Sequence, residues 1–418
     1  MKRVIAILLM TAMLCACASA PDAETPVSPT AEPIWHVDAT SAPTATLTPT
    51  PTPTEEPTPS PTPTPSPTPA DPIADYVAAM SVEQLAGQLV LFGFNGTDSV
   101  PSSYADFMAK YHIGGIVLFG VKNTVRKDSD GGFARAERLI ADINANNLSD
   151  IPLFIALDVE GGAVTRFTWE RSLYSAKTLG NKDDTALAYE QFEYISQTLK
   201  SIGVNMNLAP VLDVADDPSS TFLGGRIISS DAQIAARVGS ACIAGVQAGG
   251  CLSVVKHFPG HGATEDDSHA VTPVVYKTLS QLYSYELIPF AAGVAAGAGG
   301  VMVGHILYPN IDPDNIASLS PIFITDILRG ELGFDGIVMS DSFTMQGLSD
   351  FASVQDAAVR FILAGGDVIL CGVGQSTQTR ILDALLAAAN SGVISRERLE
   401  ESVYRILGAK SYVTGWTP

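Results

Sequence analysis

A short apolar run that recurs eight times between residues 89 and 371 constrains the fold more than any other feature of this sequence. Most of the runs are continuous and bounded by Gly, Pro or Asp, which is typical of strands buried on both faces of a sheet. The eight predicted strands are Leu89–Phe94, Gly115–Phe119, Leu153–Asp158, Asn205–Asp213, Leu252–His257, Gly300–His305, Gly336–Asp341 and Asp367–Cys371. The predicted helices include Phe133–Asn146, Thr185–Ser201, Asp231–Ala248, Leu279–Ala296 and a terminal helix over Ser395–Lys410.

Strands that alternate with helices in this way predict a parallel α/β sheet, and closure into a single (β/α)8 TIM-type barrel is the natural solution. An open, doubly wound sheet is the alternative. Such a sheet usually carries a Gly-x-Gly-x-x-Gly phosphate loop after its first strand, and the sequence has no such loop there.

The distribution of proline separates the first 72 residues from the rest. Sixteen of the 27 prolines lie between residues 21 and 72, and Thr and Pro alternate almost without interruption from Thr48 to Pro69. Such a segment cannot bury apolar surface, and its prolines favour an extended polyproline II conformation. We therefore expect a disordered linker over residues 17–72 and the folded barrel over residues 73–418.

The extreme N-terminus has the pattern of an export signal. Lys2 and Arg3 precede the apolar run Val4–Leu14, which is too short to span a bilayer as a permanent helix. The run leads into Leu14-Cys15-Ala16-Cys17, which resembles the lipobox of bacterial lipoproteins and implies a signal peptide over residues 1–16 and lipid on Cys17. The alternative is an ordinary cleaved signal with an incidental cysteine. The resemblance predicts an exported protein that is held on the outer face of the cell membrane by lipid alone.

Charge and cysteine usage exclude other classes. The chain has a net charge of −20, and the part after residue 72 still carries 37 acidic against 22 basic residues. Nucleic acid is therefore not an expected partner, because phosphate binding needs clusters of Lys and Arg. Cys242, Cys251 and Cys371 are odd in number and lie in apolar surroundings, so we expect buried free thiols.

Ionisable residues gather where the predicted strands end. They are Asp158, Asp213, Lys256 with His257, His305, and Asp341. In a barrel, the carboxyl ends of the strands form the face that carries the chemistry. A single Asp there could simply cap the next helix, but five strand ends with ionisable groups make that interpretation weak for the set.

The densest segment runs from Lys256 to His269 and contains three of the six histidines. A metal site is one interpretation, but the Pro and Gly residues of the segment exclude the helix that a His-x-x-x-His site would need. Asp267 and His269 favour another role. A carboxylate two residues from an imidazole can orient the ring and raise its basicity, which makes a general acid/base.

The same segment resembles glycoside hydrolase family 3, and within it the β-N-acetylglucosaminidase (β-N-acetylhexosaminidase) branch. Its signature Lys-His-Phe-Pro-Gly-His-Gly followed by Asp-Ser-His is complete at Lys256–Gly262 and Asp267–His269. The other matching blocks are Met80–Gln88, Gly114–Phe119, Leu157–Gly162 with Arg166, Asn207–Val214, Gly225–Arg226, Val301–Met302 with His305, and Gly333–Gly336 leading into Met339–Ser342. The resemblance runs from about residue 75 to the C-terminus.

The resemblance implies roles for individual residues. Asp341 matches the nucleophile that forms a glycosyl-enzyme, His269 matches the acid/base, and Asp267 matches its partner. The residues matching those that hold the sugar hydroxyls are Asp158, Arg226, Lys256 and His257, and those expected in or near the site are Arg166, His305 and Met345. The resemblance also implies a monomer that acts on N-acetylglucosamine-containing glycans without a cofactor or a metal.

The implied chemistry is physically reasonable. Retaining glycosidases normally use two carboxylates about 5–5.5 Å apart, and an imidazole with a pKa near 6.5 can replace one of them at neutral pH. We expect Lys256 and Arg226 to lie near Asp341 and keep it ionised. β-Glucosidase relatives take their acid/base from a second domain. Since only helices are predicted after the last strand here, we expect the barrel to supply it.

Two departures from the family pattern are visible. Ser342 stands where many relatives have a second acid, and Ala163 stands where an Arg is common. The leading hypothesis is an exo-β-N-acetylglucosaminidase that acts on peptidoglycan fragments or chitooligosaccharides. A phosphorylase is an alternative, because an imidazole acid/base does not repel an incoming phosphate anion. A glycan-binding lipoprotein on an inactive barrel is the third interpretation.

Overall fold

The computed structural model describes residues 71–95, 98–119 and 132–418. The predicted signal peptide, Cys17 and residues 17–70 of the predicted linker lie outside the described residues. None of the helices in the described ranges is long and apolar enough to cross a membrane.

Eight parallel strands form the central sheet, at the positions that the sequence predicts. They are β1 Val90–Gly93, β2 Gly115–Val117, β3 Phe154–Leu157, β4 Met206–Asn207, β5 Leu252–Phe258, β6 Gly300–Val303, β9 Ile337–Ser340 and β10 Ile369–Val373. Their order is β10-β1-β2-β3-β4-β5-β6-β9, and a parallel bridge between Met339 and Val368 joins the two outer strands. The chain is therefore a TIM-like α/β barrel, and the predicted fold class is confirmed.

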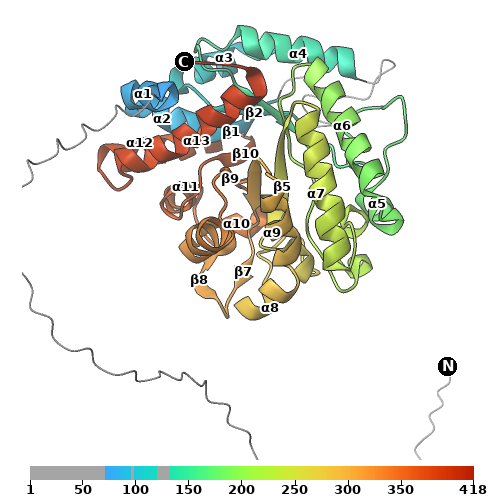
Figure 1. Cartoon of the computed structure of the whole chain (residues 1–418). Helices are drawn as coiled ribbons and strands as arrows, with labels where there is room; N and C mark the ends of the chain where they lie inside the picture. The colour runs from blue at the N-terminus through green and yellow to red at the C-terminus, as the bar shows by residue number, and fades with distance from the viewer. Residues whose placement is uncertain (1–70, 96–97, 120–131) are drawn as a thin grey trace, which may run out of the picture. The chain divides into compact units, whose positions relative to one another are not determined.

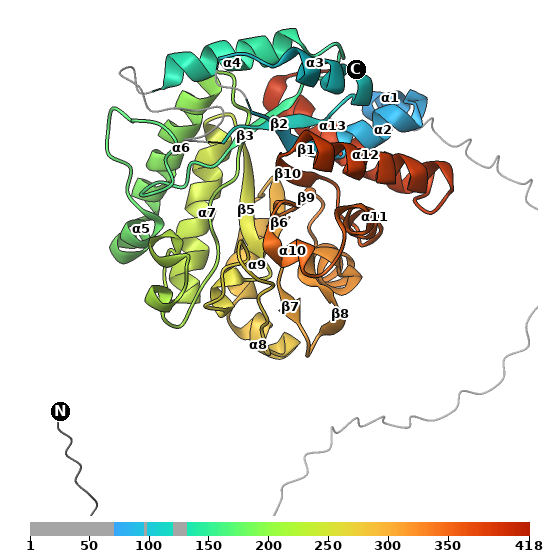
Figure 2. The same cartoon turned by 180° about the vertical axis from the view of Figure 1, so that it is seen from behind.

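Helices surround the strands (Figures 1 and 2). They are α1 Pro72–Ala79, α2 Val82–Gln88, α3 Ser102–Tyr111, α4 Phe133–Ala145, α5 Ala176–Lys182, α6 Thr185–Ser201, α7 Ala232–Ala248, α8 Leu279–Ser284, α9 Leu287–Ala295, α10 Gln346–Ser349, α11 Val354–Leu363, α12 Gln375–Asn390 and α13 Arg396–Thr414. A π-helix η5 (Ile322–Glu331) and an antiparallel hairpin of β7 (Leu307–Tyr308) and β8 (Asp312–Ile316) complete the layer.

Capping residues account for several helix boundaries. Asp184 caps α6 by accepting a hydrogen bond from the Leu187 amide, and Asp231 caps α7 in the same way. The predicted single helix Leu279–Ala296 is wrong, because the structure divides it into α8 and α9 at Tyr285. Pro289 explains the division: it has no amide hydrogen to donate to the Tyr285 carbonyl, and its ring crowds that carbonyl.

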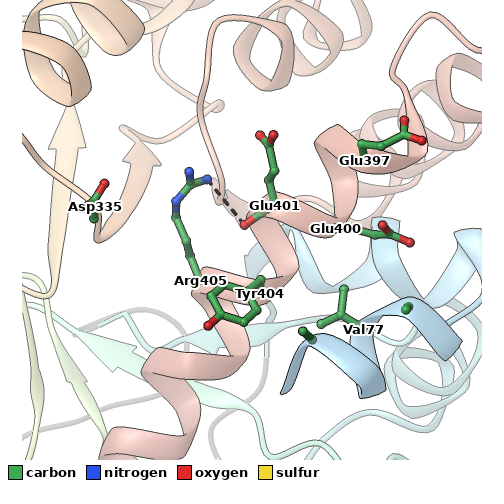
Figure 3. A pocket seen from close by; sticks show the side chains of 9 residues that line it. Val77, Asp335, Glu397, Glu400, Glu401, Tyr404 and Arg405 are labelled. Atoms are coloured by element: carbon green, nitrogen blue, oxygen red, sulfur yellow. Dashed lines mark hydrogen bonds between the residues drawn. The ribbon is translucent and has the colours of Figure 1, made fainter. Parts of the chain in front are cut away.

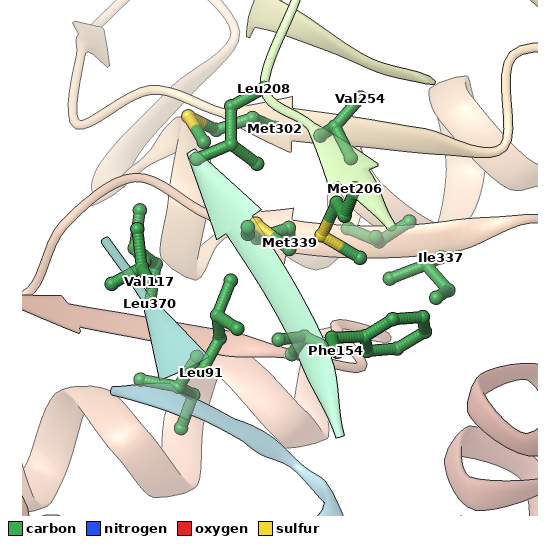
Figure 4. Packing of buried hydrophobic residues seen from close by; sticks show 14 of the residues in the cluster. Leu91, Val117, Phe154, Met206, Leu208, Val254, Met302, Ile337, Met339 and Leu370 are labelled. Atoms are coloured by element: carbon green, nitrogen blue, oxygen red, sulfur yellow. The ribbon is translucent and has the colours of Figure 1, made fainter. Parts of the chain in front are cut away.

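Apolar side chains from all eight strands fill the core. Figure 4 labels several of them, including Leu91, Phe154, Met206, Val254 and Ile337, which point toward one another. All of these are buried. The cysteines of the described residues (Cys242, Cys251 and Cys371) are buried and free, as predicted.

Candidate active site

A cavity of about 280 Å³ opens at the carboxyl ends of the strands. Among its lining residues are the predicted site residues Asp158, Arg166, Arg226, Lys256, His257, His269, Asp341 and Met345. Phe119, Glu160, Val164, Leu208, Phe222, His261, Ser268, Met302, Ser342 and Leu370 complete the lining. The structure thus brings together residues from positions 119 to 370 of the sequence on one face of the barrel.

Lys256 links two carboxylates in one wall of this cavity. Its Nζ lies 2.7 Å from Asp158 Oδ1 and 2.8 Å from Glu160 Oε1. Arg166 Nη2 donates to Asp158 Oδ2 at 2.7 Å, and Arg226 donates to both oxygens of Glu160 at 2.8 and 3.0 Å. This network places three cations against two carboxylates, so the wall carries a net positive charge.

Burial and pairing act in opposite directions on these groups. Burial alone would raise the pKa of Asp158 and Glu160, but Lys256 and the arginines lower both pKa values below their usual range. Burial alone would lower the pKa of Lys256, and the two carboxylates raise it instead. All three groups are therefore charged at neutral pH.

Glu160 is a site residue for which the sequence analysis assigned no role. It lies in the matched block Leu157–Gly162, two residues after Asp158. The turn that follows brings it to the cavity: its amide donates to the Val164 carbonyl at 2.9 Å, and Gly161 has a φ of +89°. A Cβ atom at Gly161 would come within 2.3 Å of the Tyr174 carbonyl oxygen, so only glycine fits there. The sequence could have indicated Glu160, because it is a second acidic residue directly before the two glycines of a tight turn.

Asp213 forms hydrogen bonds with two histidines and lies behind the cavity wall. Its Oδ2 lies 2.7 Å from His257 Nδ1, and its Oδ1 accepts a hydrogen bond from the His261 amide at 2.6 Å. Burial alone would raise the pKa of Asp213, but His257 and the hydrogen bond from the His261 amide lower it. Asp213 is fully buried and does not line the cavity, so it acts on the site through the orientation of His257.

Asp341 lies at the carboxyl end of β9 and is only 9% exposed. Its Oδ1 accepts a hydrogen bond from the Ser342 amide at 2.7 Å. Burial alone would raise its pKa, but His257 and the Ser342 amide lower it below the usual value. Lys256 and Arg226, the cations expected to keep Asp341 ionised, are paired with Asp158 and Glu160 in the structure.

His305 lies beneath the nucleophile rather than in the cavity lining. It is fully buried, with Nδ1 2.8 Å from Ser318 Oγ and Nε2 3.2 Å from the Ser342 carbonyl oxygen. Burial lowers its pKa below the usual value for histidine. The neutral ring therefore accepts a hydrogen bond from Ser318 and donates one to Ser342, which holds the backbone beside Asp341 in place.

The predicted pair of Asp267 and His269 is present on the loop after β5. Their Oδ1 and Nδ1 atoms lie 2.7 Å apart, and the His269 amide also donates to Asp267 Oδ1 at 2.9 Å. The two side chains are 67% (His269) and 40% (Asp267) exposed. His257, His261 and His269 each pair with a different residue, and no three His, Cys, Asp or Glu side chains in the described part of the chain are grouped to hold a metal ion.

A larger hollow of about 610 Å³ lies between α1 and α13 (Figure 3). It is lined by Ala74, Val77, Ala78, Asp335, Glu397, Glu400, Glu401, Tyr404 and Arg405. Arg405 donates to the Glu401 carbonyl within its own helix. Since Asp335 precedes β9, this hollow is at the amino ends of the strands, where barrel residues serve stability rather than chemistry.

Comparison with known proteins agrees with the geometry. Residues 81–409 match the model of the family described as the glycosyl hydrolase family 3 N-terminal domain. A protein named beta-hexosaminidase A from Pseudoalteromonas piscicida is 30% identical over 338 residues, which cover 75% of this chain and 56% of that protein. A beta-hexosaminidase from Nitrosomonas eutropha is 32% identical over 70% of this chain and 84% of its own length.

Two solved structures share the fold. A family 3 beta-N-acetylglucosaminidase from a Paenibacillus species superimposes with a TM-score of 0.75 and 38% identity, over 80% of this chain and 63% of that one. A beta-N-acetylhexosaminidase from Beutenbergia cavernae gives 0.73 and 29%, over 80% of this chain and 99% of that one. This chain thus spans less than two thirds of some relatives and nearly all of others.

Proposed function

Because the chain belongs to glycosyl hydrolase family 3, we propose that it is a retaining exo-β-N-acetylglucosaminidase that removes terminal β-linked N-acetylglucosamine from peptidoglycan fragments or chitooligosaccharides. One observation carries the proposal: a buried carboxylate with one oxygen unpaired among the described residues, Asp341, lines the same cavity as an exposed imidazole that is oriented by a carboxylate, His269. The names of the relatives support the choice of sugar.

In the first step, an oxygen of Asp341 attacks the anomeric carbon while the bond from that carbon to the leaving oxygen breaks. His269, protonated, gives its proton to the leaving oxygen, so the aglycone departs as an alcohol. Asp267 stabilises the imidazolium before this transfer, and its own pKa is lowered by the His269 amide and ring despite partial burial. The product is a sugar esterified to Asp341 and a neutral His269.

In the second step, the neutral His269 takes a proton from water as the water oxygen attacks the anomeric carbon. The bond to Asp341 breaks, the carboxylate is regenerated, and the sugar leaves with its original anomeric configuration. The charged groups of Asp158, Glu160, Lys256 and Arg226 would hold the sugar hydroxyls. A cavity of about 280 Å³ with such walls suits one terminal sugar unit, which favours exo cleavage.

The direct test is release of phenol from an aryl N-acetyl-β-glucosaminide by the purified protein. Asp341→Ala should abolish release, and His269→Ala should lower it strongly. Sugar binding without any turnover by the wild-type protein would contradict the proposal and would favour a glycan-binding role instead.

The histidine acid/base also allows a second candidate, a phosphorylase. A neutral imidazole near the anomeric carbon does not repel phosphate as a carboxylate would. Reactions run with and without inorganic phosphate would separate the two: a sugar 1-phosphate product identifies the phosphorylase, and free N-acetylglucosamine in both reactions identifies the hydrolase.

We further propose that residues 1–16 are a signal peptide, that Cys17 carries lipid, and that residues 17–72 tether the barrel to the outer face of the cell membrane. The charge pattern of residues 2–14 and the Leu-Cys-Ala-Cys sequence support this. Incorporation of labelled palmitate into the wild-type protein, and its loss in Cys17→Ala, is the expected result. Equal labelling of both proteins would contradict it.

A further inference from the structure

Ser268 differs in its surroundings from the two dyad residues that flank it. His269 is exposed and Asp267 is half-buried, whereas Ser268 is only 1% exposed. Its Oγ lies 2.7 Å from His261 Nε2, and its carbonyl oxygen accepts a hydrogen bond from the Gly347 amide at 2.9 Å. One residue therefore anchors the exposed loop to two different parts of the barrel.

The first anchor, His261, is rigidly held. It is fully buried, its amide donates to Asp213 Oδ1 at 2.6 Å, and its ring meets Phe222 edge to face with the centroids 4.7 Å apart. Through Asp213, this anchor is connected to His257 in the wall of the cavity.

The second anchor, Gly347, lies in α10, six residues after Asp341. The Thr272 hydroxyl donates to the Gly347 carbonyl at 2.8 Å, so both ends of the loop bind to this position. A Cβ atom at Gly347 would lie 3.0 Å from the Ser268 carbonyl oxygen, which leaves little room for a larger residue.

We propose that Ser268 is a positioning residue that sets the distance and direction of the His269 ring relative to Asp341. The inference rests on the function proposed above. A side chain as exposed as His269 has few packing contacts of its own, so its place depends on where its backbone is held. Small displacements of a catalytic group cost large factors in rate, which makes such an anchor effective.

The protonation state of His261 suits this role. Burial lowers its pKa to about 4, so the ring is neutral at neutral pH. Its Nδ1 is buried without a hydrogen-bond partner in the described part of the chain. Since a buried N–H without a partner is rarer than a buried lone pair without one, the proton belongs on Nε2, and His261 donates to Ser268 Oγ.

The test compares wild type and Ser268→Ala on two aryl N-acetyl-β-glucosaminides. The dinitrophenyl substrate has a leaving group that needs little proton donation, whereas a substrate with a less acidic phenol depends on His269. General acid catalysis typically supplies about 10²–10⁴-fold, so we expect Ser268→Ala to lose roughly 10- to 100-fold in kcat/KM on the less acidic phenol and less than about threefold on the dinitrophenyl substrate.

Two companion variants address the hydrogen bond itself. Ser268→Thr retains the hydroxyl and should restore the wild-type ratio between the two substrates. His261→Phe retains the ring contact with Phe222 but cannot donate a hydrogen bond, so it should give the same ratio between the two substrates as Ser268→Ala. The double variant that combines Ser268→Ala with His261→Phe should lose little more activity than either single variant, because both changes remove the same hydrogen bond.

Ser402→Ala is the matched control, because Ser402 is also fully buried but binds Asp367 at the opposite end of the barrel. It should lower thermal stability without changing the substrate ratio. An equal loss of Ser268→Ala on both substrates would show a merely structural role and overturn the inference. A wild-type protein that hydrolyses neither substrate would overturn the proposed function, and this inference with it.

Discussion

Two buried aspartates on neighbouring strands show how the two ends of the barrel use the same side chain differently. Asp341 follows β9 at the carboxyl end of the sheet, and Asp367 precedes β10 at the amino end. Asp341 accepts one hydrogen bond, from the Ser342 amide, and no described residue donates to its second oxygen. That oxygen is therefore available for a substrate.

Asp367 has no such available oxygen. Ser402 Oγ donates to its Oδ1 at 2.6 Å, the Val338 amide donates to its Oδ2 at 2.9 Å, and Arg329 Nη2 donates to Oδ2 at 2.5 Å. Arg405 and Arg398 lie 3.3 and 3.6 Å from Oδ1. This aspartate links η5, α13 and the strands, and neither of its oxygens is available to a ligand.

Burial and ion pairing therefore do not by themselves identify a catalytic carboxylate. Unused hydrogen-bonding capacity that faces a cavity distinguishes Asp341 from Asp367. At the end of the barrel that serves stability, every oxygen of the buried carboxylate has a hydrogen-bond donor. At the end that serves chemistry, one carboxylate oxygen has no donor in the described part of the protein and can accept a hydrogen bond from a ligand or react with it.

The largest expected effect comes from exchanging each aspartate for its uncharged isostere. Asp341→Asn should lower kcat by roughly 10⁴-fold or more with little change in thermal stability, because it removes the nucleophile and no structural pair. Asp367→Asn should do the opposite: it removes a fully buried charge that faces three partly buried arginines, and it should cost about 3–5 kcal/mol of unfolding free energy. Steady-state kinetics and urea unfolding of both variants check this, and a stable, fully active Asp341→Asn would break the comparison.

The next largest effect is expected at Glu160, the carboxylate in the cavity wall for which the sequence predicted no role. Glu160→Gln removes the charge that faces Lys256 and Arg226, so both cations should shift. We expect KM to rise roughly tenfold, equivalent to about 1.4 kcal/mol of binding free energy, with a smaller change in kcat. Michaelis–Menten analysis measures it. Glu170→Gln, at an exposed position ten residues later in the chain, is the control and should behave as wild type.

A pH-dependent effect is expected at the amino end of the barrel. Lys410 Nζ is fully buried, donates to Gln88 Oε1 at 2.7 Å, and lies 5.2 Å from the centre of the Phe154 ring. Burial lowers its pKa to about 7. Between pH 7 and 10 the unfolded chain therefore binds one more proton than the folded one, so this group makes unfolding free energy rise with pH, by up to about 1.4 kcal/mol per unit.

Lys410→Met removes that titration. Its stability relative to wild type should be greatest near pH 6 and should fall as the pH rises toward 10. Urea unfolding across this range, with the exposed Lys177→Met as a control that keeps the wild-type slope, measures the effect. Parallel stability curves for wild type and Lys410→Met would show that the buried amine stays charged.

The smallest effect is expected on the surface beside α1. Tyr404 Oη donates to Asp71 Oδ2 at 2.8 Å, and both residues are exposed. Water replaces such a bond readily, so Tyr404→Phe should leave both the melting temperature and kcat/KM unchanged within error. A clear loss of stability would mean that the amino end depends on exposed contacts as well as on the saturated buried ones.

Much of the fold follows from the sequence alone. Continuous apolar runs such as Leu252–His257 predict strands buried on both faces, and the structure has β5 there. The helix Thr185–Ser201 has its predicted bounds because Asp184 caps it. The β7–β8 hairpin was not predicted, since a two-residue strand such as Leu307–Tyr308 has no periodicity to detect.

The fold class and the face that holds the ionisable residues could be predicted from the sequence, because apolar runs, caps and strand ends are local properties of the chain. The partners of these ionisable residues became clear only from the folded structure. It assigned Lys256 to Asp158 and Glu160 rather than to Asp341, it joined His261 to Ser268, and it saturated Asp367 while leaving one oxygen of Asp341 without a donor. Ion pairs and hydrogen bonds form only where two groups lie within a few ångströms of each other, and the folded positions of strands, helices and loops together set those distances.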